Sequence, residues 1–130
     1  MSATAITFVR RPAGRRLAYA VLALAMLVAV VLKAIEHGAG WQIAAGGLGP
    51  DLALFVGIGS GLEKGQLHPR AVWLYNLLHR YWLPVALAVA AAFGLVSFAV
   101  LLGALAWGFH ISLDRALGYG LRIRDGFQSS

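Results

Sequence analysis

Long, almost uninterrupted apolar segments constrain this chain more than any other feature. Leu17 to Leu32 is one such run, and the chain from Arg70 to Gly118 is nearly continuously apolar. A helix that crosses a bilayer needs about 20 predominantly apolar residues, so the first run predicts one span over about 17–36. At about 1.5 Å per residue the second run is more than twice as long as a bilayer core is thick. We therefore expect it to fold back once.

Glycine and proline set the other expected boundaries. Phe93-Gly94 is the best turn within the long run, which gives a third span at about 71–92 and a fourth at about 95–117. A further apolar segment at about 41–61 supplies the second span. Proline removes a backbone donor and clashes with the preceding turn, so Gly49-Pro50 predicts that this span is broken or kinked. The predicted fold is all-α, a four-span transmembrane helical bundle.

Composition supports a membrane protein and excludes several alternatives. Hydrophobic residues make up 60% of the 130 residues and charged residues 12%, against about 25% charged in a soluble domain. A soluble chain this small could not bury so much apolar surface. The net charge of +6 lies beside apolar runs rather than on a polar, aromatic-rich surface, so no nucleic-acid partner is expected. The absence of cysteine excludes disulfides and thiolate metal sites.

The distribution of basic residues predicts the orientation. We expect a basic N-terminal segment at 1–16, a membrane domain at 17–118 and a tail at 119–130. The N-terminal segment, the 62–70 loop and the tail hold eight of the eleven Lys and Arg residues, and Lys33 is the clear exception. The positive-inside rule therefore places both termini in the cytoplasm of a bacterial inner membrane. A cleaved signal peptide is the rival interpretation, but the first run is long for one and no clear small-x-small site follows it.

Four ionisable residues fall inside the predicted spans: Asp51, His79, His110 and Asp114. Such a group costs about 2.5–3.5 kcal/mol at the centre of a span, so it usually faces the protein interior. His79 lies 15 residues before Gly94 and His110 lies 16 after it, which gives the two imidazoles similar depth in an antiparallel hairpin. His110 and Asp114 are four apart and share a helix face. Counting across the 62–70 loop places Asp51 at the same depth, near the cytoplasmic side.

Two histidines and two carboxylates suit a divalent metal such as zinc, manganese or iron. Helical bundles build metal sites from an in-register pair on one helix and single ligands from others. Such a metal could lower the pKa of bound water and generate a hydroxide nucleophile. Asp51 and Asp114 are the candidate catalytic residues, each as a ligand or as the general base. The candidate supporting residues are Asn76, Arg80 and Arg115.

A structural polar network is the alternative interpretation of the same residues. Asp51 could cap the helix that begins after the break. Asp114 could pair with Arg80 or Arg122. Each histidine could hydrogen-bond a neighbouring carbonyl and hold two helices together. A proton-handling or cofactor role is a third interpretation.

Three strings carry a family resemblance. They are Gly49-Pro50-Asp51-Leu52, then Tyr75-Asn76-Leu77-Leu78-His79 with Pro84 after it, then His110-Ile111-Ser112-Leu113-Asp114-Arg115-Ala116-Leu117-Gly118-Tyr119-Gly120-Leu121-Arg122. Over roughly residues 15 to 127 the chain resembles a family of small bacterial membrane proteins, domain of unknown function 4260. The resemblance implies a membrane protein without an assigned activity, and it marks the same two histidines and two aspartates.

The tail departs from that resemblance. The family tends to continue past Gly-Phe into a Thr-His pair, whereas Gln128-Ser129-Ser130 follows Gly126-Phe127 here. If the missing histidine were a ligand, a metal site in this chain would be incomplete. The order Pro-Asp, His and His-x-x-x-Asp is also similar to that of bacterial membrane-bound metal-dependent hydrolases.

Two functional hypotheses follow, and whether the protein is an enzyme stays open between them. The first is a metal-assisted hydrolase that opens to the cytoplasmic leaflet and acts on a lipid or another amphiphile. The second is an accessory subunit of a larger membrane complex, respiratory or photosynthetic for example. The Gly57/Gly61 pair, a GxxxG helix-packing signal, is compatible with the subunit or with self-association. A small transporter ranks third. The lipid bilayer is the partner common to all three.

Overall fold

The computed structural model describes residues 13–38 and 40–128, and most of the predicted basic segment at 1–16 lies outside them. The described residues are helical with connecting loops, and apart from one isolated β-bridge they contain no strand. The elements are α1 (Ala13–His37), α2 (Trp41–Leu48), the 3₁₀ helix η1 (Gly49–Leu52), α3 (Ala53–Val56), the 3₁₀ helix η2 (Pro69–Ala71), α4 (Val72–Leu78), α5 (Trp82–Ala92) and α6 (Phe98–Leu117).

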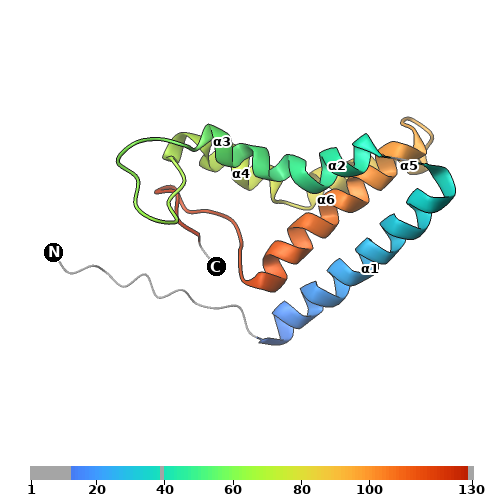
Figure 1. The fold of residues 1–130 in the computed structure, drawn as a ribbon, viewed down its shortest axis with the longest axis horizontal. Coiled ribbons are helices and arrows are strands. Elements are labelled where there is room, and N and C mark those ends of the chain that lie inside the picture. The colour runs from blue at the N-terminus through green and yellow to red at the C-terminus, as the bar shows by residue number, and fades with distance from the viewer. Residues whose placement is uncertain (1–12, 39, 129–130) are drawn as a thin grey trace.

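The two longest helices, α1 and α6, run side by side and antiparallel (Figure 1). At one end of the pair, Arg16 Nε donates to the carbonyl oxygen of Ala116 at 2.9 Å. At the other end, the His37 ring lies 4.3 Å from the ring of Phe98. Of the helices in the described part of the chain, these two are long and apolar enough to cross a membrane.

The predicted second span is broken at the expected place. It consists of α2, η1 and α3, and Pro50 is buried in the first turn of η1. The predicted third span is also broken, which the sequence analysis did not anticipate: α4 ends at Leu78 and α5 begins at Trp82. Pro84 explains this second break, because it has no N–H to bond the carbonyl of Arg80 and its ring clashes with that turn. The four predicted spans, of which the second was expected to be broken, therefore correspond to two long helices and two interrupted segments.

The turn at Phe93-Gly94 is confirmed. The helix α5 ends at Ala92, α6 begins at Phe98, and Gly94 has a φ of 74°. The Gly57/Gly61 pair, in contrast, is not a helix-packing face. Gly57 follows the last residue of α3, and Gly61 lies in the loop beyond it with a φ of 75°.

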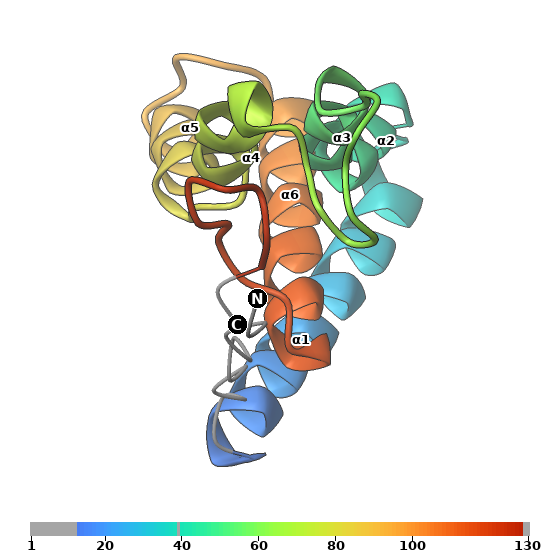
Figure 2. The ribbon, with the colours of Figure 1, turned by 90° about the vertical axis from the view of Figure 1, so that its left-hand side faces the viewer.

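A different glycine pair brings two helices into backbone contact. A Cβ on Gly46 of α2 would collide with the carbonyl oxygen of Gly103 on α6, and a Cβ on Gly103 would lie 2.7 Å from the carbonyl oxygen of Gln42. Small residues permit this close approach without a side chain between the helices. As a result α6 packs centrally, between α1, α2 and α5 (Figure 2).

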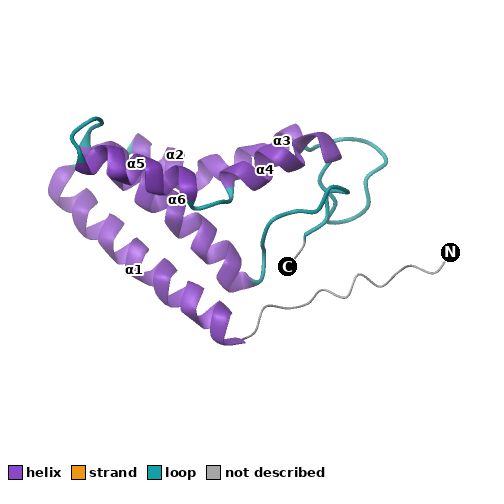
Figure 3. Ribbon diagram, turned by 180° about the vertical axis from the view of Figure 1, so that it is seen from behind, coloured by secondary structure: helices purple, strands orange, loops and turns teal. Residues whose placement is uncertain are grey.

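The C-terminal segment 119–128 is part of the fold rather than a free tail. Leu67 N–H donates to the carbonyl oxygen of Gly126 at 2.9 Å. The side chain of Asn76 on α4 exchanges two hydrogen bonds with the backbone of Arg122, at 2.8 and 2.6 Å. This segment therefore packs with α3, α4 and the 57–68 loop into a second lobe, which diverges from the α1–α6 pair (Figure 3).

Candidate metal centre

The four ionisable residues singled out from the sequence meet at the two helix breaks. Asp51 lies on η1, and His79 follows the last residue of α4. His110 and Asp114 face them from successive turns of α6. Each interrupted segment thus contributes one residue from the point where its regular helix stops.

The spacing of the four donor atoms is that of a small coordination sphere. The Nε2 atom of His79 lies 3.5 Å from Asp51 Oδ1 and 3.4 Å from Asp114 Oδ2. The Nε2 atom of His110 lies 3.1 Å and 3.3 Å from the same two oxygens, and all four atoms lie within 4.8 Å of one another. Ligands bound tetrahedrally to zinc at about 2.0–2.1 Å are about 3.3–3.4 Å apart. Every histidine–aspartate distance is therefore close to a tetrahedral edge.

The other ring nitrogen of each histidine fixes its tautomer. His79 Nδ1–H donates to the carbonyl oxygen of Tyr75 and His110 Nδ1–H to that of Gly47, both at 2.7 Å. A neutral imidazole then carries its lone pair on Nε2. Both Nε2 atoms are buried and have no hydrogen-bond partner among the described residues. With both imidazoles neutral, two lone pairs and two carboxylates converge on one point, and a bound cation or a proton on Nε2 would relieve their mutual repulsion.

Exposure gives the cluster an inner and an outer side. His79 and His110 are buried, with 3% and 9% of their surface exposed. The side chain of Asp114 is 24% exposed and that of Asp51 is 50% exposed. The centre therefore opens on the side of Asp51.

A layer of aromatic and polar contacts supports His79. The ring of Tyr75 stacks on that of His79, with centroids 3.9 Å apart. Tyr75 is in turn held by the C-terminal segment: Gln128 Nε2 donates to its hydroxyl at 3.0 Å, and the Arg122 guanidinium lies 4.7 Å from its ring centroid. The four donors converge without a histidine from the tail. Ser129, where the family resemblance expects that histidine, lies outside the described residues.

The three candidate supporting residues have different surroundings. Arg115 donates to the carbonyl oxygen of His79 at 3.5 Å and to the Tyr19 hydroxyl at 3.1 Å, so it ties the break at His79 to α1. Asn76 secures the C-terminal segment rather than the cluster. Arg80 is exposed.

The structural roles considered for these residues were a helix cap, an arginine pair and histidine–carbonyl hydrogen bonds, and in the described part of the chain only the last is present as expected. Asp51 does not cap a helix, since neither η1 nor α3 has a side-chain capping bond. Asp114 faces the two histidines, whereas Arg122 lies over Tyr75. The expected histidine–carbonyl bonds do exist, but they use Nδ1 and leave Nε2 toward the cluster.

Sequence reasoning missed the residues that orient the histidines. Tyr75 precedes His79 by four residues, so helical spacing alone could have suggested their contact. Gly47 carries no side chain, and nothing in the sequence pairs its carbonyl with His110.

Fold and cluster together define the class: a small helical protein with two apolar helices of membrane-spanning length and a His₂Asp₂ cluster at two helix breaks. The chain belongs to the family described as domain of unknown function (DUF4260), whose model matches residues 16–130. The resemblance drawn from the three sequence strings is thereby confirmed. No curated protein and no solved structure matches the chain.

Proposed function

We propose that this protein is an integral membrane metalloprotein that binds one divalent cation between Asp51, His79, His110 and Asp114 and uses it to activate water for hydrolysis. The observation that carries the proposal is the pair of buried, unpartnered Nε2 atoms that face two carboxylates at tetrahedral spacing. The Nδ1–carbonyl bonds add to it, because metal-binding histidines are commonly oriented by such contacts.

The surface of α1 supports the membrane setting. Of its 25 residues, Ala23 and Val30 are the buried ones. Large apolar side chains elsewhere on it are exposed, for example Leu24 at 62% and Ile35 at 77%. Such a helix is unfavourable in water and favourable in hydrocarbon.

The donor set and its spacing favour zinc. Imidazole and carboxylate ligands suit zinc, manganese and iron, but a four-donor tetrahedral arrangement is the preferred geometry of zinc. A catalytic zinc site keeps one position for water. Asp51 is the most exposed of the four donors, so we assign it as the ligand that yields its position to water.

Each residue of the cluster then has a distinct role. His79, His110 and Asp114 hold the cation from the buried side. The cation supplies a lowered pKa for the incoming water. Asp51, displaced but still within reach, accepts the proton of that water. The half-exposed side of the centre is where a substrate enters.

Metal analysis of the protein purified in detergent tests the binding. We expect about one equivalent of zinc per chain in the wild type, because four donors converge on one point. His110→Ala should hold less than about a tenth of that. His37→Ala is the matched control, since His37 is exposed at the end of α1 and lies outside the cluster. Equal metal content in all three proteins would contradict the assignment, and a folded wild type without metal would make the cluster a structural network.

Hydrolysis is tested by separating binding from proton transfer. In Asp51→Asn the three buried-side donors remain, so we expect zinc to stay bound while hydrolysis of nitrophenyl esters by the bilayer-embedded protein falls about 10²-fold or more. The measurement compares rates and zinc content in the same preparations. A wild-type rate no greater than that of His110→Ala would refute the hydrolase and leave the accessory subunit as the leading hypothesis, ahead of a small transporter.

A further inference from the structure

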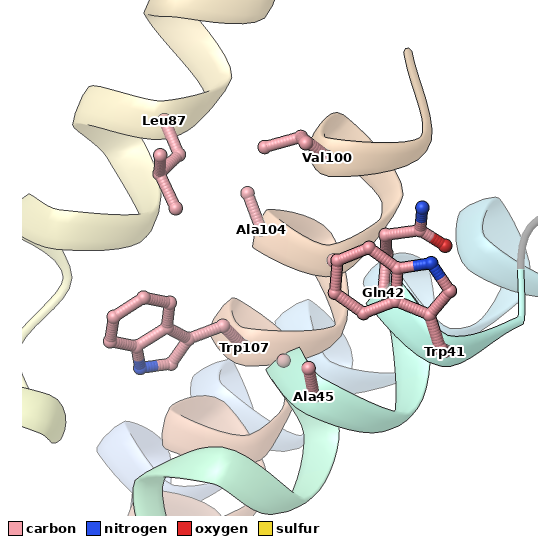
Figure 4. Close-up of a pocket in the computed structure, with 9 residues that line it drawn as sticks. Trp41, Gln42, Ala45, Leu87, Val100, Ala104 and Trp107 are labelled. Atoms are coloured by element: carbon pink, nitrogen blue, oxygen red, sulfur yellow. The ribbon is translucent and has the colours of Figure 1, made fainter. Parts of the chain in front are cut away.

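An apolar cavity of about 250 Å³ lies between α2, α5 and α6 (Figure 4). Figure 4 shows Leu87 of α5 and Trp41 of α2 on opposite sides of it, with Ala104 of α6 between them. An apolar cavity of roughly 150 Å³ is enough to hold a benzene molecule. The cavity is therefore large enough for a segment of a hydrocarbon chain.

The cavity has a closed floor and an open mouth. Gly103 and Ala104 on α6 are buried and form part of the floor, where the backbones of α2 and α6 touch. At the mouth, Trp41 is 73% exposed and Ala45 is also exposed. In a membrane-embedded protein this surface faces lipid chains, so the molecules that reach the mouth are themselves hydrocarbon-rich.

One face of α6 connects the cavity to the metal centre. Val100, Ala104 and Trp107 line the cavity. His110 and Asp114 follow Trp107 at helical spacings of three and seven residues, on the same face. The cavity and the cluster therefore lie at successive levels of one face of α6.

Trp107 forms the boundary between the two sites. Its indole N–H donates to the carbonyl oxygen of Leu78 at 2.6 Å, and Leu78 directly precedes His79. On α2, the cavity residue Gly46 directly precedes Gly47, whose carbonyl accepts from His110. The cavity therefore ends beside Gly47, which orients His110, and its wall residue Trp107 bonds to the residue before His79.

We infer that this cavity binds the hydrocarbon chain of an amphiphilic ester, and that the ester group of this substrate lies at the metal centre. The inference rests on the proposed hydrolase and names its substrate class. In the reaction, the oxygen of water bonds to the electrophilic atom of the ester, and the bond from that atom to the leaving oxygen breaks. The proton taken from the water passes to the leaving oxygen, so an acid and an alcohol are released. Trp107 and Ala104 select for a chain, while His79, His110 and the two aspartates act on the head.

Photo-crosslinking in a bilayer tests the cavity without requiring turnover. The full chain is reconstituted with a trace of a phospholipid that carries a diazirine in one acyl chain, irradiated, and mapped by mass spectrometry. We expect the α6 segment 98–107 to be labelled more strongly than the more exposed outer face of α1. Ala45→Leu narrows the mouth and should lower the α6 labelling at least about threefold, because the added side chain occupies the volume that the acyl chain needs.

The controls separate this inference from the proposed function. Ala86→Leu adds the same side chain at an exposed position of α5 outside the cavity, and it should leave the labelling unchanged. If Ala45→Leu does not fold, Val100→Phe, which fills the cavity from α6, should lower the α6 labelling in the same way. The acyl site would be overturned, even if zinc binds, by labelling that follows the exposure of each segment and does not change in Ala45→Leu or Val100→Phe. Cavity labelling in a protein that binds no zinc would support the acyl site and refute the hydrolase.

Discussion

At the scale of single residues, each histidine of the cluster is held by a backbone carbonyl at Nδ1 and faces the two aspartates with Nε2. For His79 both the orienting carbonyl and the stacked ring belong to Tyr75. The sequence could predict that His79, His110, Asp51 and Asp114 lie at one depth, because depth follows from counting residues along antiparallel helices. It could not predict the tautomers, since these depend on main-chain carbonyls that no residue type marks.

Tyr75 is the residue whose removal should disturb the centre without removing a ligand. Tyr75→Ala keeps the carbonyl that accepts from His79 but loses the stacked ring, so we expect zinc affinity to fall about 10- to 100-fold, as is typical when outer-shell partners of a ligand are lost. Tyr75→Phe keeps the ring and should lose far less. Competition with a chelator of known affinity measures both. If Tyr75→Ala binds zinc as tightly as the wild type, the stack does not orient His79.

At the scale of elements, the sequence predicted the helix break at Pro50 but not the one between α4 and α5. Pro50 lies within the break that it causes, so its position was predictable. Pro84 acts on the carbonyl four residues before it, so the break falls at His79 to Tyr81, ahead of the proline that causes it. The role of the tail was unpredictable for another reason, since Asn76 and Arg122 are 46 residues apart.

The crossing of α2 over α6 carries the Gly47 carbonyl to His110 and should be sensitive to one methyl group. Gly46→Ala places a Cβ against the backbone of Gly103, and such overpacking costs about 1–3 kcal/mol or more. We expect a lower Tm and weaker zinc binding from the same preparation. Gly47→Ala is the matched control, because a Cβ there meets no described atom within 4 Å. Equal losses in the two variants would show that the close crossing is not the cause.

At the scale of the whole molecule, the ends of the long helices define the topology. The contact of Arg16 with Ala116 places the start of α1 beside the end of α6, and Gln66 Nε2 donates to the carbonyl oxygen of Asp125 at 2.7 Å. Arg16 at the start of α1 lies at one end of the α1–α6 pair, beside the end of α6. The C-terminal segment continues from that end of α6 to the 57–68 loop of the second lobe. Charge alone had suggested the same grouping.

We predict that this side faces the cytoplasm, because it carries most of the basic residues. A reporter fused after Ser130 should be active only if it is a cytoplasmic reporter. Reversing the sign of Arg15 and Arg16 together is the informative variant, since it weakens the charge bias at the first helix and should increase the fraction of inverted molecules. Activity of a periplasmic reporter on the wild-type chain would contradict the orientation.

The most direct test of the central claim is X-ray absorption at the zinc edge on the zinc-loaded protein in a bilayer mimic. We predict about four nitrogen and oxygen ligands at about 2.0–2.1 Å, with the outer-shell scattering of two imidazoles. A spectrum of solvated zinc without imidazole scattering, or a protein that retains no zinc at all, would contradict the claim that Asp51, His79, His110 and Asp114 form a metal centre.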